Sequence, residues 1–189
     1  MTTVMRQLTS EELEAGLDTI RQSPADEGVL ELIVRRPLAG VREVLQEGAL
    51  DPVVGLVGDN WRRRSSSRTP NGSPHPDMQL NVMNARVAAL VAQHKGRWAL
   101  AGDQLFIDMD LSEANLPAGT RLSLGSAVIE VTDQPHTGCG KFVERFGLDA
   151  MKFVNSTEHK ALHLRGINAR VVQPGTIRIG DVAKKLSDP

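Results

Sequence analysis

Cysteine and aromatic residues are scarce in this chain of 189 residues, and no apolar run is long enough to cross a bilayer. Tyrosine is absent, and the sequence holds only two tryptophans, four phenylalanines and one cysteine. A single cysteine excludes an intramolecular disulfide, and few aromatic rings remain on which single-stranded nucleic acid could stack. The first ten residues also lack the apolar core of a signal peptide. We therefore expect a cytoplasmic protein that binds neither nucleic acid nor membranes.

Charge is almost balanced along the chain, with a formal net charge of −1. Any binding of anions must therefore come from local clusters of arginine and lysine. The length suits one domain with a single buried core. With so few aromatic residues, that core has to be built mainly from Leu, Val, Ile and Ala.

Local patterns predict short strands mixed with helices. Thr9 to Glu12 fits a capping box, and apolar residues at helical spacing follow until Pro24. Further helices are predicted at 78–93, from Cys139 to 146, and at 150–162. Strands are predicted at 29–35, 105–109, 121–124, 127–132, 164–172 and 176–179. We expect an α+β fold around a closed or strongly curved sheet.

One long connection interrupts this pattern. Residues 65–76 are rich in Ser, Pro, Gly and Asn, and with their flanks they exceed the ~12 to 15 residues of ordinary loops. Such a segment is either a functional lid or a disordered loop.

Cys139 stands between two glycines and directly before a predicted helix. Partial positive charge at a helix N-terminus, together with His136 and Lys141, favours the thiolate, which is the nucleophilic and metal-binding form of cysteine. The flanking glycines leave room for a bulky ligand. The alternative is that Cys139 is a small apolar core residue.

Other chemistries fit the same region less well. Gly138 to Lys141 resembles the end of a phosphate-binding P-loop, but Pro135 and Phe142 occupy positions where that motif needs Gly and Ser or Thr. A zinc site is a better-supported alternative. His136 and Cys139 have a suitable spacing, and His159 and His163 would share one face of a helix.

Arginines form a second signal, because planar guanidinium groups suit phosphate and other oxyanions. Arg62, Arg63, Arg64 and Arg68 crowd the long loop, while Arg165 and Arg170 flank a glycine near the C-terminus and Arg35 and Arg36 precede a proline. A solvated basic loop is the alternative for the first cluster.

Three segments closely resemble the MOSC domain, the module named after the C-terminal part of molybdenum-cofactor sulfurases. They are Pro135–Phe142, Leu164–Val171 and Pro174–Asp181. Upstream, residues 55–59, 79–91 and 116–122 resemble the same family more loosely. The resemblance covers about residues 30–182, which leaves an N-terminal helical extension at 1–29 and a C-terminal tail at 183–189. The chain departs from the family in having Gly102-Asp103-Gln104-Leu105 where many relatives have Gly-Glu-Asn-Leu.

The resemblance implies a β-barrel-like curved sheet with peripheral helices and a role with molybdenum cofactor, without a domain for pyridoxal phosphate. Cys139 matches the key cysteine of the family, which can ligate molybdenum or carry a persulfide. From charge and motif position we add His136, Lys141, Arg165, Asn168, Arg170, Arg62 and Arg63 as cofactor-binding residues.

Two functions follow from this resemblance. The first is a molybdenum-dependent reductase of N-hydroxylated or N-oxygenated small molecules, which needs an external electron-transfer protein because the chain lacks the cysteines of an iron–sulfur cluster. The second is a carrier of sulfur or cofactor that depends on a sulfur-donor protein. A zinc or thiol protein unrelated to molybdenum is the third possibility.

Overall fold

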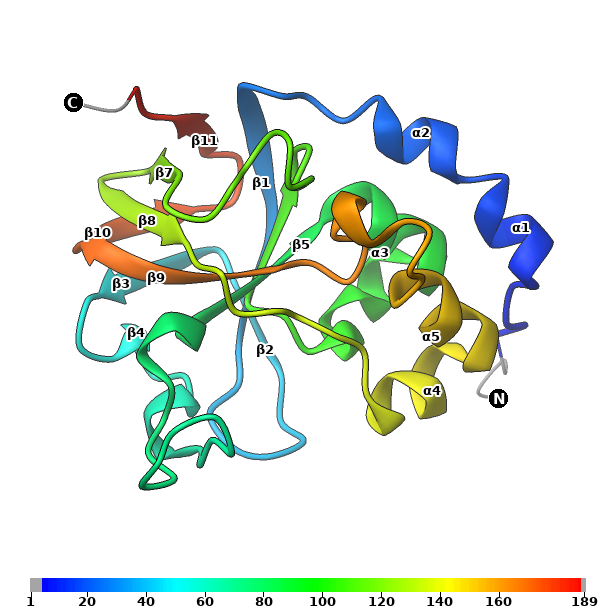
Figure 1. Cartoon of the computed structure of the whole chain (residues 1–189). Coiled ribbons are helices and arrows are strands. Elements are labelled where there is room, and N and C mark those ends of the chain that lie inside the picture. Colours follow the sequence, from blue (N-terminus) through cyan, green and yellow to red (C-terminus); the bar gives the residue numbers. More distant parts are fainter. Residues whose placement is uncertain (1–4, 188–189) are drawn as a thin grey trace.

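A closed mixed β-barrel forms the centre of the computed structural model, which describes residues 5–187 (Figure 1). Strand β1 pairs with both β6 and β11, and the second pairing closes the sheet. All neighbouring strands are antiparallel except β5 and β6. In barrel order the strands are β11 (Val182–Lys185), β7 (Arg121–Leu124), β8 (Ala127–Val131), β9 (Ile167–Gln173), β5 (Leu80–Asn84), β6 (Leu105–Asp108) and β1 (Glu27–Arg35). The predicted α+β class and the curved sheet are confirmed.

A small antiparallel sheet covers one end of the barrel, and a short strand extends the large sheet. The small sheet consists of β10 (Gly175–Arg178), β3 (Glu47–Asp51) and β4 (Gly55–Leu56), and β2 (Glu43–Leu45) pairs with the second half of β1. Leu50, Leu56 and Ile177 from the small sheet are part of the barrel's interior core. Burial of these side chains fixes the small sheet on the barrel.

Two hydrophobic cores share the barrel wall. Leu30 and Ile33 of β1 belong to the core inside the barrel, whereas Leu32 and Val34 belong to a second core between the barrel and the helices. The register of β1 against β6 shifts between Leu30 and Leu32. A bulge of this kind changes which face successive residues occupy, and it explains why the alternation in 29–35 is imperfect.

The helices pack on one side of the barrel, as Figure 1 shows. They are α1 (Ser10–Glu14), α2 (Leu17–Arg21), α3 (Ala85–Ala92), α4 (Gly140–Phe146) and α5 (Leu148–Val154), with the 3-10 helix η3 (Lys95–Ala101). The other 3-10 helices are η1 (Trp61–Arg63), η2 (Pro76–Met78) and η4 (Lys160–Leu162). The predicted capping box is confirmed, since Thr9 accepts from the Glu12 backbone N–H and Glu12 accepts from that of Thr9. No helix among the described residues is long and apolar enough to span a membrane.

Three predicted helices were wrong in extent, and the N-terminal one divides into α1 and α2. Residues 78–93 contain the strand β5 before α3, because Leu80 and Val82 both point into the barrel and Asn84 then caps the helix. An apolar run of this length does not distinguish a buried strand from a helix. Residues 150–162 likewise divide into the end of α5 and the 3-10 helix η4.

The strands extend slightly beyond the predicted domain limits of 30–182. Strand β1 begins at Glu27, and residues 183–185 of the predicted tail belong to β11, which pairs with β1 and β7. Within the predicted extension 1–29, the structure places α1 and α2 against the outer core. Residues 1–4 and 188–189 of these two predicted segments lie outside the described part of the chain.

The backbone at Gly166, just before β9, has a positive φ of 121°, and a Cβ there would lie 2.2 Å from the carbonyl oxygen of Val82. Gly180 also has a positive φ, but no atom in the described part of the chain would lie within 4 Å of its Cβ. We expect Gly166→Ala to lower the free energy of unfolding by more than about 2 kcal/mol, and Gly180→Ala by about 1 kcal/mol. Urea denaturation measures both. Equal losses of free energy of unfolding in the two variants would contradict the expected clash between a Cβ at position 166 and Val82.

Candidate functional site

Cys139 occupies the N-cap position of α4, and its side chain is exposed. Its carbonyl oxygen accepts from the backbone N–H groups of Phe142 and Val143, and Phe142 and Phe146 anchor the helix in the outer core. The predicted helix start is confirmed, whereas the alternative of a buried core cysteine is wrong. The fold therefore holds the backbone of Cys139 rigidly and leaves its thiol accessible.

The two glycines beside Cys139 serve different purposes. A Cβ on Gly138 would lie 2.7 Å from Sδ of Met151, and the Gly138 N–H donates to Oδ1 of Asn155 at 2.8 Å. A Cβ on Gly140 would meet no atom of the described residues within 4 Å. Gly138 is therefore needed for close packing on α5, and only Gly140 borders open space.

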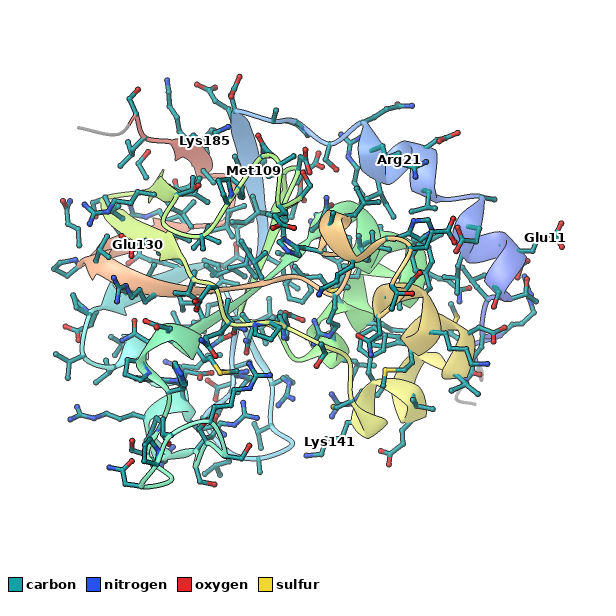
Figure 2. All side chains as sticks on the ribbon, viewed as in Figure 1. Glu11, Arg21, Met109, Glu130, Lys141 and Lys185 are labelled. Atoms are coloured by element: carbon teal, nitrogen blue, oxygen red, sulfur yellow. The ribbon has the colours of Figure 1, made fainter. Side chains whose placement is uncertain are left out.

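Cys139 lines a cavity of about 280 Å³ between the segment 61–78 and the start of α4. Figure 1 shows both at the lower edge of the molecule, and Figure 2 labels Lys141 there. No Asp or Glu of the described chain lines this cavity. Its cationic residues are Arg36, Arg42, Arg64, Lys141, Arg145 and Arg165.

Asp103 lies buried beside the cavity and binds two of its lining residues. Its Oδ1 is 2.7 Å from Nε2 of His136, and its Oδ2 accepts from Arg165 at 2.7 Å. Arg165 also donates to the carbonyl of Ala101 and stacks over the Phe142 ring at 5.1 Å. The Nε group of Arg165 is buried without a hydrogen-bond partner among the described residues.

These contacts set the charge states of the group. Burial alone would raise the pKa of Asp103, but the charge of Arg165 and the hydrogen bonds from His136 and Arg165 hold it below its ordinary value. Burial and the neighbouring Arg165 lower the pKa of His136, so the imidazole is neutral near pH 7. A neutral imidazole donates to the Asp103 carboxylate through Nε2, which leaves Nδ1 as an acceptor.

A second buried pair closes the opposite wall. Arg36 donates to both oxygens of Asp59 through Nε and NH2, at 2.9 and 2.8 Å, and NH1 donates to Asn81 Oδ1 and to the carbonyl of Gly102. Asp59 also accepts from the backbone N–H of Trp61 at 3.0 Å. Both carboxylate oxygens and four donors are satisfied, as a buried ion pair requires.

A hydrogen-bonded chain joins this pair to the cysteine loop. Asn81 donates to Oδ1 of Asn168 at 2.7 Å, and Asn168 donates to the carbonyls of Gln134 and Pro135 at 3.0 and 3.3 Å. Asn168 is fully buried in β9. It therefore fixes the segment that carries His136 and Cys139 and does not itself line the cavity.

The structure brings four of the predicted site residues together and separates the others. Cys139, His136, Lys141 and Arg165 line the cavity, and Asn168 supports it from behind. Arg62 and Arg63 are exposed in η1 and do not line it.

Arg170 also lies away from the cavity, because it points outward from β9. Its guanidinium pairs with Glu130 at 2.7 Å and with Asp77 at 3.2 Å. Figure 2 shows Glu130 on β8, well separated from Lys141. Arg170 flanks the glycine bend in sequence, but alternation along β9 directs it to the outside of the barrel.

Sequence reasoning missed Arg42 and Arg145 and did not assign Arg36 or Arg64 to the site. Arg64 is the next residue after the two arginines that were selected, and the turn of η1 decides which of the three faces inward. Arg42 and Arg145 lie far apart in the sequence and carry no motif. Only the tertiary structure places both beside Cys139.

The cavity arginines crowd each other. Burial lowers the pKa of Arg42, and the charges of Arg145, Arg36 and Arg64 lower it further. Partial burial and the charge of Arg36 lower the pKa of Arg64. Arginine stays protonated in proteins, so these charges persist, and an anion would relieve their repulsion.

The zinc alternative is not supported by the described residues, among which no group of three or more His, Cys, Asp or Glu could hold a metal ion. His159 precedes η4 and binds Glu14 at 3.0 Å, while His163 binds the carbonyl of Leu111 at 2.8 Å. They do not share the face of an α-helix, because residues 155–159 are irregular.

A larger cavity of about 640 Å³ lies behind the same loop. His136, Thr137 and Arg165 separate the two cavities, and Cys139 lines only the smaller one. The larger cavity has both acidic and basic residues on its wall, including Glu113, Asp133 and Lys160. The concentration of one charge beside a nucleophilic sulfur singles out the smaller cavity as the candidate site.

The fold and the site together define a mixed β-barrel protein with a cationic cysteine cavity, and its solved structural neighbours have the same fold. YuaD from Bacillus subtilis matches with a TM-score of 0.58 and 16% identity, covering 86% of this chain and 97% of the other. YiiM from Escherichia coli matches with a TM-score of 0.53 and 20% identity, covering 85% and 71%. YiiM from Geobacillus stearothermophilus has a TM-score of 0.51 and 14% identity, covering 87% and 75%.

The family model of the MOSC domain matches residues 75–184, which is more than half of the chain. The chain therefore belongs to the MOSC domain family, whose members are associated with molybdenum cofactor. A search of the curated proteins finds no match.

His136 should make the stability of the protein sensitive to mild acid. Its pKa is lowered in the folded chain, so the neutral ring stabilises the fold above its ordinary pKa of about 6.5, and this stability is lost as pH falls below that value. Asp103 has a similar effect only below about pH 4. We expect wild type to lose free energy of unfolding between pH 7.5 and 5.5, and His136→Gln to lose less, in urea titrations. His94→Gln, at an exposed histidine, should follow wild type. An unchanged pH dependence in His136→Gln would contradict the assignment.

Proposed function

We propose that this chain binds molybdenum cofactor in the cavity at Cys139 and reduces N-hydroxylated or other N-oxygenated small molecules. The observation that carries the proposal is an exposed thiol in a cavity lined by six cationic side chains and by no carboxylate of the described chain. Membership of the MOSC family supplies the cofactor class. The activity itself is our inference from these two facts.

The residues present fit such a cofactor in two respects. A cysteine thiolate is a soft ligand suited to a metal that already binds sulfur. The cofactor also ends in a phosphate or nucleotide, and the cavity has cations without a carboxylate partner in the described chain that could bind it. In addition, the Nε donors of Arg42 and Arg165 are buried and have no hydrogen-bond partner among the described residues. Buried donors of this kind are rare unless a ligand satisfies them.

Each residue then has a distinct task. Cys139 would ligate the metal, and cations drawn from Arg42, Arg64, Lys141 and Arg145 would hold the anionic tail. When bound, the cofactor supplies a metal ion that exchanges two electrons with the substrate.

His136 is the residue placed for proton chemistry in this cavity. Asp103 fixes its ring through Nε2 and keeps the proton there, and Nδ1 remains free to accept a hydrogen bond or a proton. Its lowered pKa keeps this acceptor available near neutral pH.

The proposed reaction converts an N-hydroxyl group to N–H and water, and it consumes two electrons and two protons. The single cysteine excludes a cysteine-ligated iron–sulfur cluster in this chain. We infer that the electrons come from a separate electron-transfer protein.

The exposure of Cys139 favours one second candidate, a sulfur carrier. In that function the Cys139 thiolate accepts a sulfur atom from the persulfide of a donor protein, which is released as a thiol. The product is a persulfide on Cys139 that another protein can collect. This function needs thiol access but no bound metal.

Cys139→Ser should abolish cofactor retention and leave the fold intact, because the side chain is exposed and makes no capping hydrogen bond. We expect near-stoichiometric molybdenum in wild type purified from a host that makes the cofactor, and little in the variant. Elemental analysis for molybdenum and zinc measures this. The free energy of unfolding should change by less than about 0.5 kcal/mol.

The same preparation separates the candidate functions. Full molybdenum content and reductase activity in Cys139→Ser would exclude both. If molybdenum is absent from wild type and mass spectrometry finds a persulfide on Cys139, the carrier function replaces the reductase.

Arg64 should contribute to cofactor affinity where Arg62 does not. Arg64 lines the cavity without a carboxylate partner in the described chain, whereas Arg62 lies outside it. Loss of a charge-assisted contact typically weakens binding about tenfold or more. We therefore expect Arg64→Gln to lower the affinity for the isolated cofactor by this factor in a binding titration, and Arg62→Gln and Arg170→Gln to match wild type. Equal losses in all three variants would show that only overall charge matters.

A further inference from the structure

The cavity has more cationic side chains than carboxylates to pair with them, so its net charge is positive. Two of its six cations have buried carboxylate partners, since Arg36 pairs with Asp59 and Arg165 with Asp103. The remaining four have no such partner among the described residues. They are Arg42, Arg64, Lys141 and Arg145.

A cofactor with one terminal phosphate does not use up this excess. A phosphate monoester carries about −1.5 to −2 charges near pH 7, so it offsets about two of the four. His136 is neutral and adds no negative charge. Positive charge therefore remains on the wall where a substrate would approach Cys139.

The wall also offers no carboxylate of the described chain to a cationic ligand. An ammonium or amidinium group needs a carboxylate or several carbonyl acceptors to replace its water. Asp59 and Asp103 are both inaccessible, with side-chain exposures of 0%, and each is already bonded to its arginine. A cation entering the cavity would lose hydration beside six positively charged side chains, with neutral groups such as the Trp61 ring and the Ser65 and Ser66 hydroxyls in place of a carboxylate.

We propose that this site selects N-oxygenated substrates that carry an anionic group, such as a carboxylate or phosphate, and rejects cationic ones. This inference rests on the proposed reductase function for the N-oxygenated part of the substrate. The charge selection follows from the cavity alone. Lys141 and Arg145, at the start and end of α4, line the cavity together with Cys139.

The only cysteine of the chain is itself a reporter of this selection. Two methanethiosulfonate reagents of similar size, one with a sulfonate and one with a trimethylammonium group, react with a thiolate to form a mixed disulfide and release methanesulfinate. Their rates with cofactor-free protein, divided by their rates with N-acetylcysteine, measure the preference of the cavity. We expect the sulfonate reagent to be favoured by about tenfold at low ionic strength and by less in 0.5 M salt, because salt screens exposed charges.

Variants test whether the cavity charges cause this preference. Arg145→Gln should reduce the ratio several-fold. Arg21→Gln removes the same charge from α2, which Figure 2 shows on the side of the molecule away from Lys141, and should leave the ratio unchanged. A wild-type ratio equal to that of N-acetylcysteine, or an equal effect of both variants, would overturn the charge selection.

Turnover by the cofactor-loaded protein completes the test. A benzamidoxime with a para carboxylate should have a kcat/KM about tenfold above that of its para trimethylammonium counterpart, measured with a chemical electron donor. Equal values would overturn the substrate assignment. If the labelling is anion-selective but neither compound is reduced, the charge selection stands and the reductase function is wrong.

Discussion

The ion pair between Arg36 and Asp59 is the contact on which the site depends most. It ties the end of β1 to the start of the long segment 61–78, because Asp59 also accepts from the Trp61 backbone. Arg36 continues the connection to Asn81, and Asn81 to Asn168, which holds the loop before Cys139. Removal of one partner would leave a buried charge unpaired, which typically costs 3–5 kcal/mol. The two walls of the cavity are therefore positioned by a single buried polar chain.

Electrostatics divides the cations of the site into two groups with different tasks. Arg36 and Arg165 are buried and fully charge-paired, so they maintain the structure and contribute little net field. Arg42, Arg64, Lys141 and Arg145 are unpaired within the described chain, and their mutual repulsion opposes folding. Unfavourable local charge that persists in a stable fold is typical of a functional site. An anionic ligand would offset the charge of the second group without breaking the ion pairs of the first.

The fold was largely predictable from local patterns, and the errors of the prediction have clear physical causes. The β-rich composition of 29–35 predicted β1 although its alternation is imperfect, because burial on both faces keeps the segment apolar across the bulge at Leu30 to Leu32. The apolar residues in 80–91 predicted one helix, although the first part is β5. Both conformations bury such a run equally well, and only the pairing of β5 with β6 and β9 decides between them.

The sequence by itself determined the helix start at Cys139, the lone thiol, the neighbouring His136 and Lys141, and the family that these residues indicate. These features are local, since a cap, a glycine pair and a short motif act within a few residues. Only the tertiary structure decided which arginines face the thiol. It brought Arg42 and Arg145 from distant segments, chose Arg64 over Arg62 and Arg63, and directed Arg170 to the opposite face of its strand. The direction of a side chain depends on strand pleat, helix turn and barrel closure, and a count of charges along a sequence contains none of these.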